Sequence, residues 1–482
     1  FFFFCWPGHG RGGSAHVRME MDGPKRTIAK PWRWILALLA TCWGATWTHA
    51  TWQGHVGADG SELARWLDEL GQVSDAHTPG AVTRLVFTPS DVRAREYVTG
   101  KMVEAGMKVR ADKIGNLFGR WEGRDKKAPS ILTGSHCDAI PLSGRFDGVV
   151  GVLGGIAAVK ALKKSGFQPQ RSIEVMMFTS EEPSRFGLSC SGSRAMAGVL
   201  HEDTVAALRD ENDTTYLEAA SAAGYGAKTI KQMLDDARVK ENTYEAFVEL
   251  HIEQGPILEQ QGINIGAVRA IAAPAALRVR FHGGGGHAGA LLMHYRNDAA
   301  LAGAELALAT ERAALRTGAE DTVATVGVFR IQPDAVNSVP REALLEIDVR
   351  DIDGPRRDEV VAEILSAAES IAATRKVKME YEMINQDPPA TCGQHVVDAV
   401  TSSAKELGYS VKSMVSRAYH DSLFMAKIAP TAMIFIPCRD GVSHRPDEFA
   451  SPEDLKRGVE TLALTMAKLS VHGYTEEAKE EL

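Results

Sequence analysis

Histidines and acidic residues that could bind metal ions or move protons recur at well-separated points of this 482-residue chain. They are His136 and Asp138 in G-S-H-C-D, Asp147 in R-F-D-G, Glu181 and Glu182 in F-T-S-E-E-P, His251 in L-H-I-E-Q-G, and His444 in G-V-S-H-R-P. Three imidazoles, one bridging carboxylate and one terminal carboxylate can hold two divalent cations with a water between them. One further acid, Glu181, remains beside the metals, so the set predicts a two-metal hydrolytic site.

Each of these residues also has an ordinary interpretation as a core or surface histidine, or as part of a solvated acidic turn. These residues share one kind of position in the chain, and this favours their interpretation as parts of an active site. Apolar runs come just before four of the points, at residues 131–132, 173–178, 247–250 and 433–436. These points therefore fall at or beyond the C-terminal ends of predicted strands, where open α/β sheets place active sites.

The first part of the chain, residues 51–267, alternates predicted helices and strands. Helices are expected at 61–70 and 90–105, with Ser90-Asp91 as the N-cap of the second, and a strand at 131–136. A buried helix is expected at 147–164, begun by Asp147, whose carboxylate would gain from the helix dipole. The glycines that follow lie inside this helix, so they do not form a dinucleotide-binding turn.

A different pattern occupies residues 268–383. Strands are expected at 277–282, 322–330, 343–351 and 376–381, with helices at 298–314 and 356–373. That order is β-α-β-β-α-β, the ferredoxin-like module. Residues 384–471 return to mixed α/β and supply His444, so the module is predicted to be inserted between two parts of a catalytic domain.

The two ends of the chain carry predicted targeting signals. Residues 1–50 read as a leader, in which 1–18 could lie upstream of the true start codon and 25–50 resemble a secretory signal peptide. The apolar stretch at 34–43 is too short to span a bilayer, so no membrane contact is expected in the mature form. The tail, residues 472–482, ends in K-E-E-L, similar to an endoplasmic reticulum retention signal. Together they predict location in the endoplasmic reticulum lumen.

The charge of the chain argues against nucleic acid as a partner. The formal net charge is −8, and residues 1–50 hold six Lys/Arg and two Asp/Glu, or +4, so the remainder carries −12. An acidic protein without basic clusters binds nucleic acid poorly. The four cysteines after the leader are far apart in sequence, and no disulfide framework is expected.

From about residue 60 to about residue 470, the order H-x-D, D-G, E-E-x-x-R-F, H-x-E-Q-G and S-H resembles the hydantoinase/carbamoylase branch of the di-metal aminoacylase/carboxypeptidase superfamily. Within it, F-T-S-E-E-P-S-R-F-G and S-R-A-Y-H-D-S-L-F-M-A are similar to plant-type ureidoglycolate amidohydrolases. Allantoate amidohydrolases and carbamoylases usually carry E-E-G where this chain has Glu182-Pro183. They also carry G-A-G-H-D-A where it has R-A-Y-H-D-S.

The resemblance implies an α/β fold with a catalytic mixed-sheet α/β/α domain of di-zinc-peptidase type and an inserted ferredoxin-like lid and dimerisation domain. The protein would then be a homodimer, in which some lid residues serve the neighbouring subunit's site. His136 and His251 would hold one metal, Glu182 and His444 the other, and Asp147 would bridge them. Glu181 would move the proton. Asp138 is expected to accept the second ring N–H of His136 and fix its tautomer.

Further residues match the family's substrate contacts. Gln254 would contact the substrate amide, and Glu253 would contact substrate or support His251. In the inserted domain, His287 matches the lid histidine that stabilises the oxyanion. Asn337 and Arg350 match lid residues that bind the substrate carboxylate, and Asp351 could hold the Arg350 side chain in place. Tyr419 and His420 match a loop that contacts the substrate.

The implied activity is hydrolysis of the ureido group of (S)-ureidoglycolate to glyoxylate, ammonia and carbon dioxide in purine (allantoin) catabolism. The resemblance suggests manganese, although the ligands alone allow Mn, Zn, Co or Ni. Hydrolysis of allantoate or of N-carbamoyl amino acids is the nearest alternative, and a metallopeptidase of the superfamily is less favoured. A non-catalytic binding protein would lack a ligand or Glu181, and none is missing.

Overall fold

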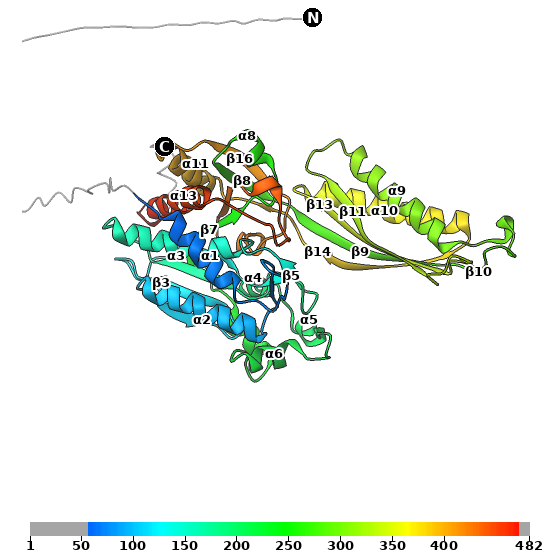
Figure 1. Cartoon of the computed structure of the whole chain (residues 1–482), viewed down its shortest axis with the longest axis horizontal. Coiled ribbons are helices and arrows are strands. Elements are labelled where there is room, and N and C mark those ends of the chain that lie inside the picture. Colours follow the sequence, from blue (N-terminus) through cyan, green and yellow to red (C-terminus); the bar gives the residue numbers. More distant parts are fainter. Residues whose placement is uncertain (1–55, 472–482) are drawn as a thin grey trace, which may run out of the picture. The chain divides into compact units, whose positions relative to one another are not determined.

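The computed structural model describes residues 56–471, so the predicted leader and the K-E-E-L tail lie outside the described residues. Its larger sheet has nine strands in the order β15-β8-β17-β7-β4-β6-β3-β2, with β16 paired to β8 (Figure 1). These strands are β2 (Lys108–Ala111), β3 (Leu117–Trp121), β4 (Ser130–His136), β6 (Ile173–Phe178), β7 (Tyr244–Ile252), β8 (Ile265–Ile271), β15 (Ala390–Thr391), β16 (Val411–Ser416) and β17 (Thr431–Ile436).

The centre of this sheet is parallel. β6 pairs with β4, β4 with β7, and β7 with β17, all in the same direction, whereas β3 and β8 run antiparallel to their neighbours. Every residue of β4, β6 and β17 is buried, as expected of strands covered on both faces. The C-terminal ends of four adjacent strands therefore meet at one edge of the sheet.

Helices cover both faces of the sheet. One face carries α1 (Gly60–Gly71), α3 (Val149–Lys164), α11 (Gln394–Glu406) and α13 (Pro452–Val471). On the other face, Met196 of α4 (Ser191–Met196) and Met425 of α12 (Ser422–Met425) join an apolar cluster with Phe178 and Phe247. Close packing of α3 requires glycine, because a Cβ at Gly151 would lie 2.5 Å from the Leu250 carbonyl oxygen.

Other short elements complete this part of the molecule. β1 (Val82–Arg84) pairs antiparallel with β5 (Ala139–Ser143), and α2 (Pro89–Glu104) packs against β2 and β3. A separate apolar cluster is built around α5 (Glu202–Ala207), α6 (Tyr216–Ala222) and α7 (Ile230–Ala237). The short helix α8 (Ile257–Gln261) follows β7.

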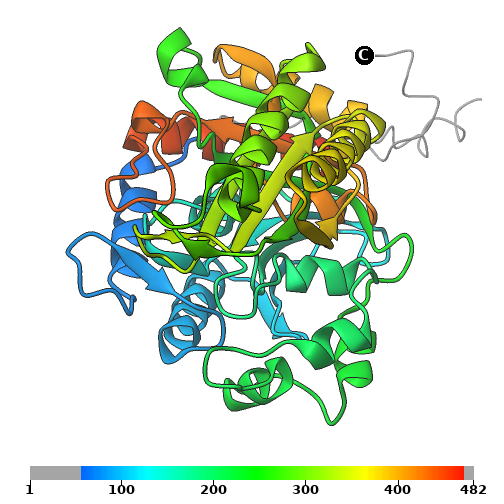
Figure 2. The ribbon, with the colours of Figure 1, turned by 90° about the vertical axis from the view of Figure 1, so that its right-hand side faces the viewer.

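A second, four-stranded antiparallel sheet has the order β11-β13-β9-β14. Its strands are β9 (Ala273–His282), β11 (Val323–Gln332), β13 (Glu342–Asp351) and β14 (Lys378–Gln386), and α9 (Ala299–Arg316) and α10 (Gly354–Arg375) intervene. The chain order is thus β-α-β-β-α-β. Figure 2 shows the two helices side by side over the strands, with which they share one apolar core. A small ladder pairs β10 (Gly286–His287) with β12 (Ser338–Val339).

Two details differ from the sequence predictions. The N-cap of α2 is Thr88 and not Ser90-Asp91; the Asp91 carboxylate is buried, accepts the Phe87 N–H and pairs with Arg95. Asp147 does not begin α3, because Gly148 is its N-cap with φ +66°. A Cβ at Gly148 would lie 2.4 Å from the His136 ring, so the chain can turn here only with glycine.

Across residues 56–471, no helix combines the length and apolar character needed to cross a membrane. The four cysteines of this part of the chain, at 137, 190, 392 and 438, are all free and buried.

Candidate active site

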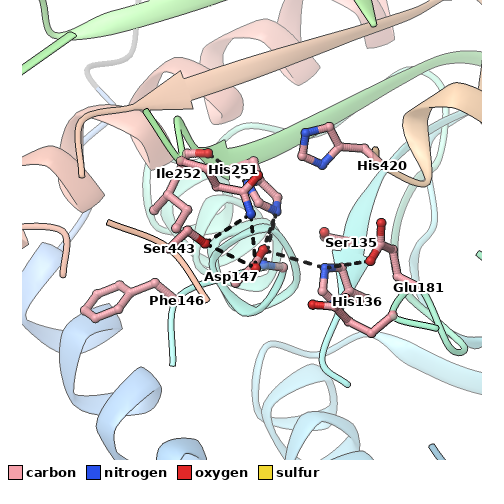
Figure 3. A network of polar contacts seen from close by, with 12 residues as sticks. Ser135, His136, Phe146, Asp147, Glu181, His251, Ile252, His420 and Ser443 are labelled. Atoms are coloured by element: carbon pink, nitrogen blue, oxygen red, sulfur yellow. Dashed lines mark hydrogen bonds and ion pairs between the residues drawn. The ribbon is translucent and has the colours of Figure 1, made fainter. Parts of the chain in front are cut away.

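The histidines and acids singled out in the sequence converge at the C-terminal edge of the parallel strands (Figure 3). His136 is the last residue of β4, and His251 lies one residue before the end of β7. Glu181 and Glu182 follow β6, and His444 lies in a loop after β17. Because these four strands are neighbours, residues far apart in sequence come together, as the strand-end argument predicted.

The first group of possible ligands is His136, Asp147 and His251, whose ligand atoms lie within 4.8 Å of one another. His251 Nε2 is 3.2 Å from Asp147 Oδ1, and His136 Nε2 is 3.9 Å from the same oxygen. All three residues are buried. The second His251 nitrogen, Nδ1, is 2.9 Å from the Ile252 carbonyl oxygen, which fixes the ring and leaves Nε2 towards Asp147.

The second group is Asp147, Glu182 and His444, again within 4.8 Å. His444 Nε2 lies 2.9 Å from Asp147 Oδ2 and 3.5 Å from Glu182 Oε1. The two groups therefore share Asp147, and each of its carboxylate oxygens faces one group. This is the disposition of a carboxylate that bridges two cations.

The donor set fits divalent cations. Within residues 56–471, the ion-pair partners of Asp147, Glu181 and Glu182 are histidines and not lysines or arginines. Burial and the neighbouring Asp147 raise the pKa of Glu182 to about 8. Buried acids that repel one another in this way are stabilised by bound cations, and nitrogen with oxygen donors suits Mn or Zn.

The pKa values of two histidines are also raised, but here the partner is the bridging carboxylate. A hydrogen bond with Asp147 raises the pKa of His444 to about 9, and the same partner raises that of His251 to about 9 despite burial. Burial alone would raise the pKa of Asp147, but the hydrogen bonds from His251 and His444 hold it well below its usual range. A carboxylate kept ionised at neutral pH is what a bridging ligand requires.

Glu181 lies beside the first group without belonging to either. Its Oε2 is 3.8 Å from His136 Nε2, and its Oε1 lies 3.6 Å from Cys190 Sγ. Burial, followed by repulsion from Glu182, raises the Glu181 pKa well above its usual range. A carboxyl that accepts a proton readily at this position can serve as a general base and acid.

The structure corrects the expected role of Asp138. His136 Nδ1 lies 3.0 Å from the Asp138 backbone oxygen and 3.7 Å from its carboxylate, so the carbonyl is the closer partner of the ring. The carboxylate instead accepts the backbone N–H groups of Glu181 at 3.3 Å and Glu182 at 2.9 Å. Asp138 thus positions the catalytic and ligand acids through their main chain.

Gln254 reaches the centre, whereas Glu253 does not. Gln254 Nε2 donates to Asp147 Oδ2 at 3.0 Å and to Ser443 Oγ at 3.2 Å, and its Oε1 is buried without a partner among the described residues. The Glu253 carboxylate accepts the N–H groups of Ile257 and Leu258, so it caps α8.

His420 and Tyr419 lie behind the ligands. The His420 ring is buried, 4.6 Å between centroids from that of His251, and its Nε2 lies 2.9 Å from Ser416 Oγ. Burial, with the nearby His251, lowers the His420 pKa well below its usual range. The Tyr419 hydroxyl donates to Asp387 and accepts from Arg194. Both side chains are therefore fixed by protein partners.

The predicted lid residues are not brought into the cluster. His287 is exposed in the β10–β12 ladder, and Asn337 is exposed in the turn just before β12. His287 Nδ1 accepts the N–H groups of Gly289 and Ala290. β9 has ten residues, so its ends are about 30 Å apart, and β10 follows its far end (Figure 1). The distance arises because the ladder lies at the tip of the inserted domain.

Arg350 lies at the other end of that sheet, opposite Pro274 near the start of β9. Its guanidinium forks onto Asp348 at 2.8 and 3.2 Å and donates to the Arg417 carbonyl, close to Tyr419 in sequence. The suggested support by Asp351 is wrong, since Asp351 pairs with Arg356.

Two functional candidates were missed in the sequence: Ser443 and Glu448. Glu448 accepts the backbone N–H groups of Phe146 and Asp147, and Ser443 lies beside both carboxylates. Their only sequence signal is proximity to His444, since partners some 300 positions away cannot be read from spacing.

Comparison with known proteins gives four relevant similarities. A family model described as Peptidase family M20/M25/M40 matches residues 132–468. Ureidoglycolate hydrolase of Arabidopsis thaliana is 53% identical over 416 residues, covering 86% of this chain and 87% of that protein. N-carbamoyl-L-amino acid amidohydrolase of Geobacillus stearothermophilus is 38% identical, covering 85% and 98%. A crystal structure of AtUAH in complex with (S)-hydroxyglycine matches with a TM-score of 0.80 and 52% identity, covering 87% and 99%.

Proposed function

The chain belongs to peptidase family M20/M25/M40, and on that premise we propose that it hydrolyses the ureido group of (S)-ureidoglycolate. It is a hydrolase of C–N amide bonds. The observation that supports this substrate is the 53% identity to a ureidoglycolate hydrolase, against 38% identity to an N-carbamoyl-L-amino acid amidohydrolase. Water and ureidoglycolate would give ammonia, carbon dioxide and hydroxyglycine, which decays to glyoxylate and a second ammonia.

His136 and His251 would hold one cation, Glu182 and His444 the other, with Asp147 between them. Enzymes of this family depend on two metal ions, and manganese is the proposed metal. Bound there, the cations would lower the pKa of a water molecule and polarise the scissile carbonyl. The donor atoms and the mutual repulsion of the buried acids support this assignment.

Glu181 would take the proton of the attacking water and return it to the leaving nitrogen. Its Oε2 lies 3.8 Å from His136 Nε2, beside the first group of ligands, and its raised pKa suits a group that must accept a proton. Cleavage of the C–N bond to the terminal amino group then releases ammonia. The remaining carbamate loses carbon dioxide.

Gln254 would orient the ureido group, because its unpartnered Oε1 can accept a substrate N–H while Nε2 holds Asp147. Arg350 would bind the substrate carboxylate from the base of the inserted domain, where Asp348 already fixes its fork. We also propose that His287 and Asn337 act in the site of a second subunit. Their exposure at the tip of the domain supports this.

A homodimer is proposed on the exposed apolar surface of the inserted domain. Leu301, Leu308 and Leu315 recur every seven residues along α9 and are 44%, 56% and 74% exposed. The neighbouring β11 is the edge strand of its sheet and exposes Phe329 and Ile331. Light scattering should give twice the chain mass for the wild type and the chain mass for Leu308→Asp. An unchanged mass for this variant would remove α9 from the interface.

The endoplasmic reticulum remains the proposed location, supported by the leader at 25–50 and the K-E-E-L end. A fluorescent protein inserted between the two signals should give a reticular pattern. Deleting the last four residues should send the fusion out of the cell. A cytosolic pattern for the intact fusion would contradict the proposal.

The substrate is tested by ammonia release from ureidoglycolate, allantoate and an N-carbamoyl amino acid, side by side with Mn²⁺. The proposal expects kcat/KM for ureidoglycolate to exceed the other two by at least a factor of about 10², the discrimination that a site built around specific polar groups can give. A higher kcat/KM on allantoate or on the carbamoyl amino acid would transfer the assignment to that substrate.

A further inference from the structure

The loop that carries His444, residues 442–450, has no regular secondary structure. The His444 side chain is 48% exposed. Its backbone has φ +58°, a strained conformation for a non-glycine residue that persists only where the surroundings impose it. Its ring meets Asp147 and Glu182, which cannot by themselves hold a loop in place. A further contact must therefore hold His444 in position.

Glu448 is the group in this loop with the most extensive contacts to the rest of the site. It is 2% exposed, and its Oε1 accepts the N–H groups of Phe146 at 2.8 Å and Asp147 at 3.0 Å. Its Oε2 accepts the Ser443 hydroxyl at 2.9 Å. One carboxylate therefore ties the loop before α3 to the loop after β17.

These contacts close into a ring around the bridging carboxylate. Gln254 Nε2 donates to Asp147 Oδ2 and to Ser443 Oγ, Ser443 donates to Glu448, and Glu448 accepts the Asp147 N–H. We call Asp147, Gln254, Ser443 and Glu448 the Asp147 ring. Including the Phe146 N–H, three N–H or O–H groups converge on the Glu448 carboxyl group.

The chain packs closely against Glu448 at Gly144. A Cβ at Gly144 would lie 2.4 Å from the Glu448 Cβ, so this glycine is required for the approach. The Phe146 and Phe449 rings meet edge to face, with centroids 5.8 Å apart. The two loops thus contact through apolar rings on one side and through the Glu448 carboxylate on the other.

We propose that Glu448 is a positioning residue for the cation site formed by Asp147, Glu182 and His444. It sets the distance between the His444 loop and Asp147, while His136 and His251 are fixed by the strands β4 and β7. Loss of Glu448 therefore weakens the second cation site more than the first. The inference rests on the proposed two-metal centre.

The test is a calorimetric titration of metal-stripped protein with Mn²⁺. The wild type should bind two ions per subunit, and His444→Ala identifies which binding event belongs to the second site. In Glu448→Ala that event should weaken by about 10–100-fold, the usual effect of removing a group that holds a ligand. In Glu448→Gln, which keeps an oxygen for the Phe146 and Asp147 N–H groups, most of the affinity should return.

Glu460→Ala is the matched control. Glu460 lies on α13, outside the Asp147 ring, and is similarly buried, at 3% exposure. Its carboxylate accepts the Ala58 N–H and the Tyr409 hydroxyl. It should lower thermal stability and leave both binding events at their wild-type affinities. Ser443→Ala, which leaves Glu448 in place, should weaken the same event by a smaller factor, and it keeps the test decisive if Glu448→Ala does not fold.

Wild-type affinity for both ions in Glu448→Ala would overturn the inference, and so would an equal loss at both sites. If Glu448→Ala does not fold, an unchanged second event in Ser443→Ala overturns it. A wild type that binds fewer than two ions would instead refute the two-metal centre itself. At saturating Mn²⁺ the activity of Glu448→Ala should recover towards that of the wild type, because the defect is one of cation affinity.

Discussion

The two parts of the predicted active site differ in how far the fold assembles them. In the nine-stranded domain, the metal-binding groups are brought within a few ångströms of Asp147, and all but His444 are buried. In the four-stranded domain, His287 and Asn337 are exposed at the tip, and Arg350 lies at the base with a protein partner. The metal-binding groups are already assembled, whereas His287 and Asn337 would have to be brought to the substrate by domain closure or by a second subunit.

The difference follows from topology. Parallel neighbours in a sheet bring their C-terminal ends to one edge whatever the length of chain between them. The inserted domain instead extends by about 30 Å along β9, so its tip can reach a centre only by closure or by belonging to another subunit. Chemistry and recognition should therefore respond to mutation in separable ways.

The largest effect is expected for Glu181→Gln. The amide keeps the size of the side chain but cannot accept a proton, so kcat should fall by about 10²–10⁴-fold or more, while both Mn²⁺ ions remain bound. Steady-state rates and metal analysis of the same preparation measure this. Turnover near the wild-type value would remove Glu181 from the chemistry, and loss of metal would reassign it as a ligand.

Arg350→Lys should separate recognition from chemistry. Lysine keeps the charge but loses the planar fork, so KM for ureidoglycolate should rise by about 10–100-fold, equivalent to the roughly 1.5–3 kcal/mol of a charge-assisted hydrogen bond. The matched control is Arg278→Lys on β9, which pairs with Glu346 and Glu382 on the same sheet and should leave KM unchanged. Equal KM values in the two variants would return Arg350 to a structural role beside Asp348.

The metal-free protein should lose stability as the pH rises above about 5, because of groups at the cation site. Glu182, Glu448, His251 and His444 have pKa values raised to about 8, 7, 9 and 9, so the folded state binds more protons. Their stabilisation is present below the unfolded pKa and is lost as pH rises to about 9. For Asp351 burial is outweighed by Arg356, and its lowered pKa stabilises the fold above about pH 4.

Thermal unfolding of metal-stripped protein should therefore show a midpoint that falls from pH 5 to pH 9, and Mn²⁺ should remove most of this decline. A metal-free midpoint that rises with pH would contradict the assignment of the buried acids and histidines as a cation site.

The smallest effect is expected for Tyr419→Phe. The hydroxyl is shared by Asp387 and Arg194, so its removal should cost about 0.5–1.5 kcal/mol of stability and change KM little. Ser191→Ala is a comparable control, since it removes a buried hydroxyl that pairs with Tyr216 away from the loop of Tyr419. A large rise in KM for Tyr419→Phe alone would restore the predicted substrate contact.

The sequence predicted the metal-binding half well because its signals are local. A histidine or acid lies at or a few residues beyond the end of each apolar run. The strand-end rule then places these residues together, as found for His136, His251 and Glu182. The period of the apolar residues also placed the main helices to within about two residues. What failed depends on contacts distant in sequence: Asp138 holds the main chain of Glu181, and Glu448 meets Asp147. The sequence offers several neighbouring residues that could cap α2 or pair with Arg350. Only the fold shows that the N-cap is Thr88 and that the partner of Arg350 is Asp348.

The central claim is that the nine-stranded domain alone supplies a preformed two-metal centre for ureido hydrolysis. It is tested most directly by adding Mn²⁺ stepwise to metal-stripped protein and measuring ammonia release from ureidoglycolate at each ratio of ions to subunits. The account predicts little activity without metal and full activity only after the second equivalent, when Asp147 can bridge two ions. Full activity in the stripped protein, or after the first equivalent, would contradict it.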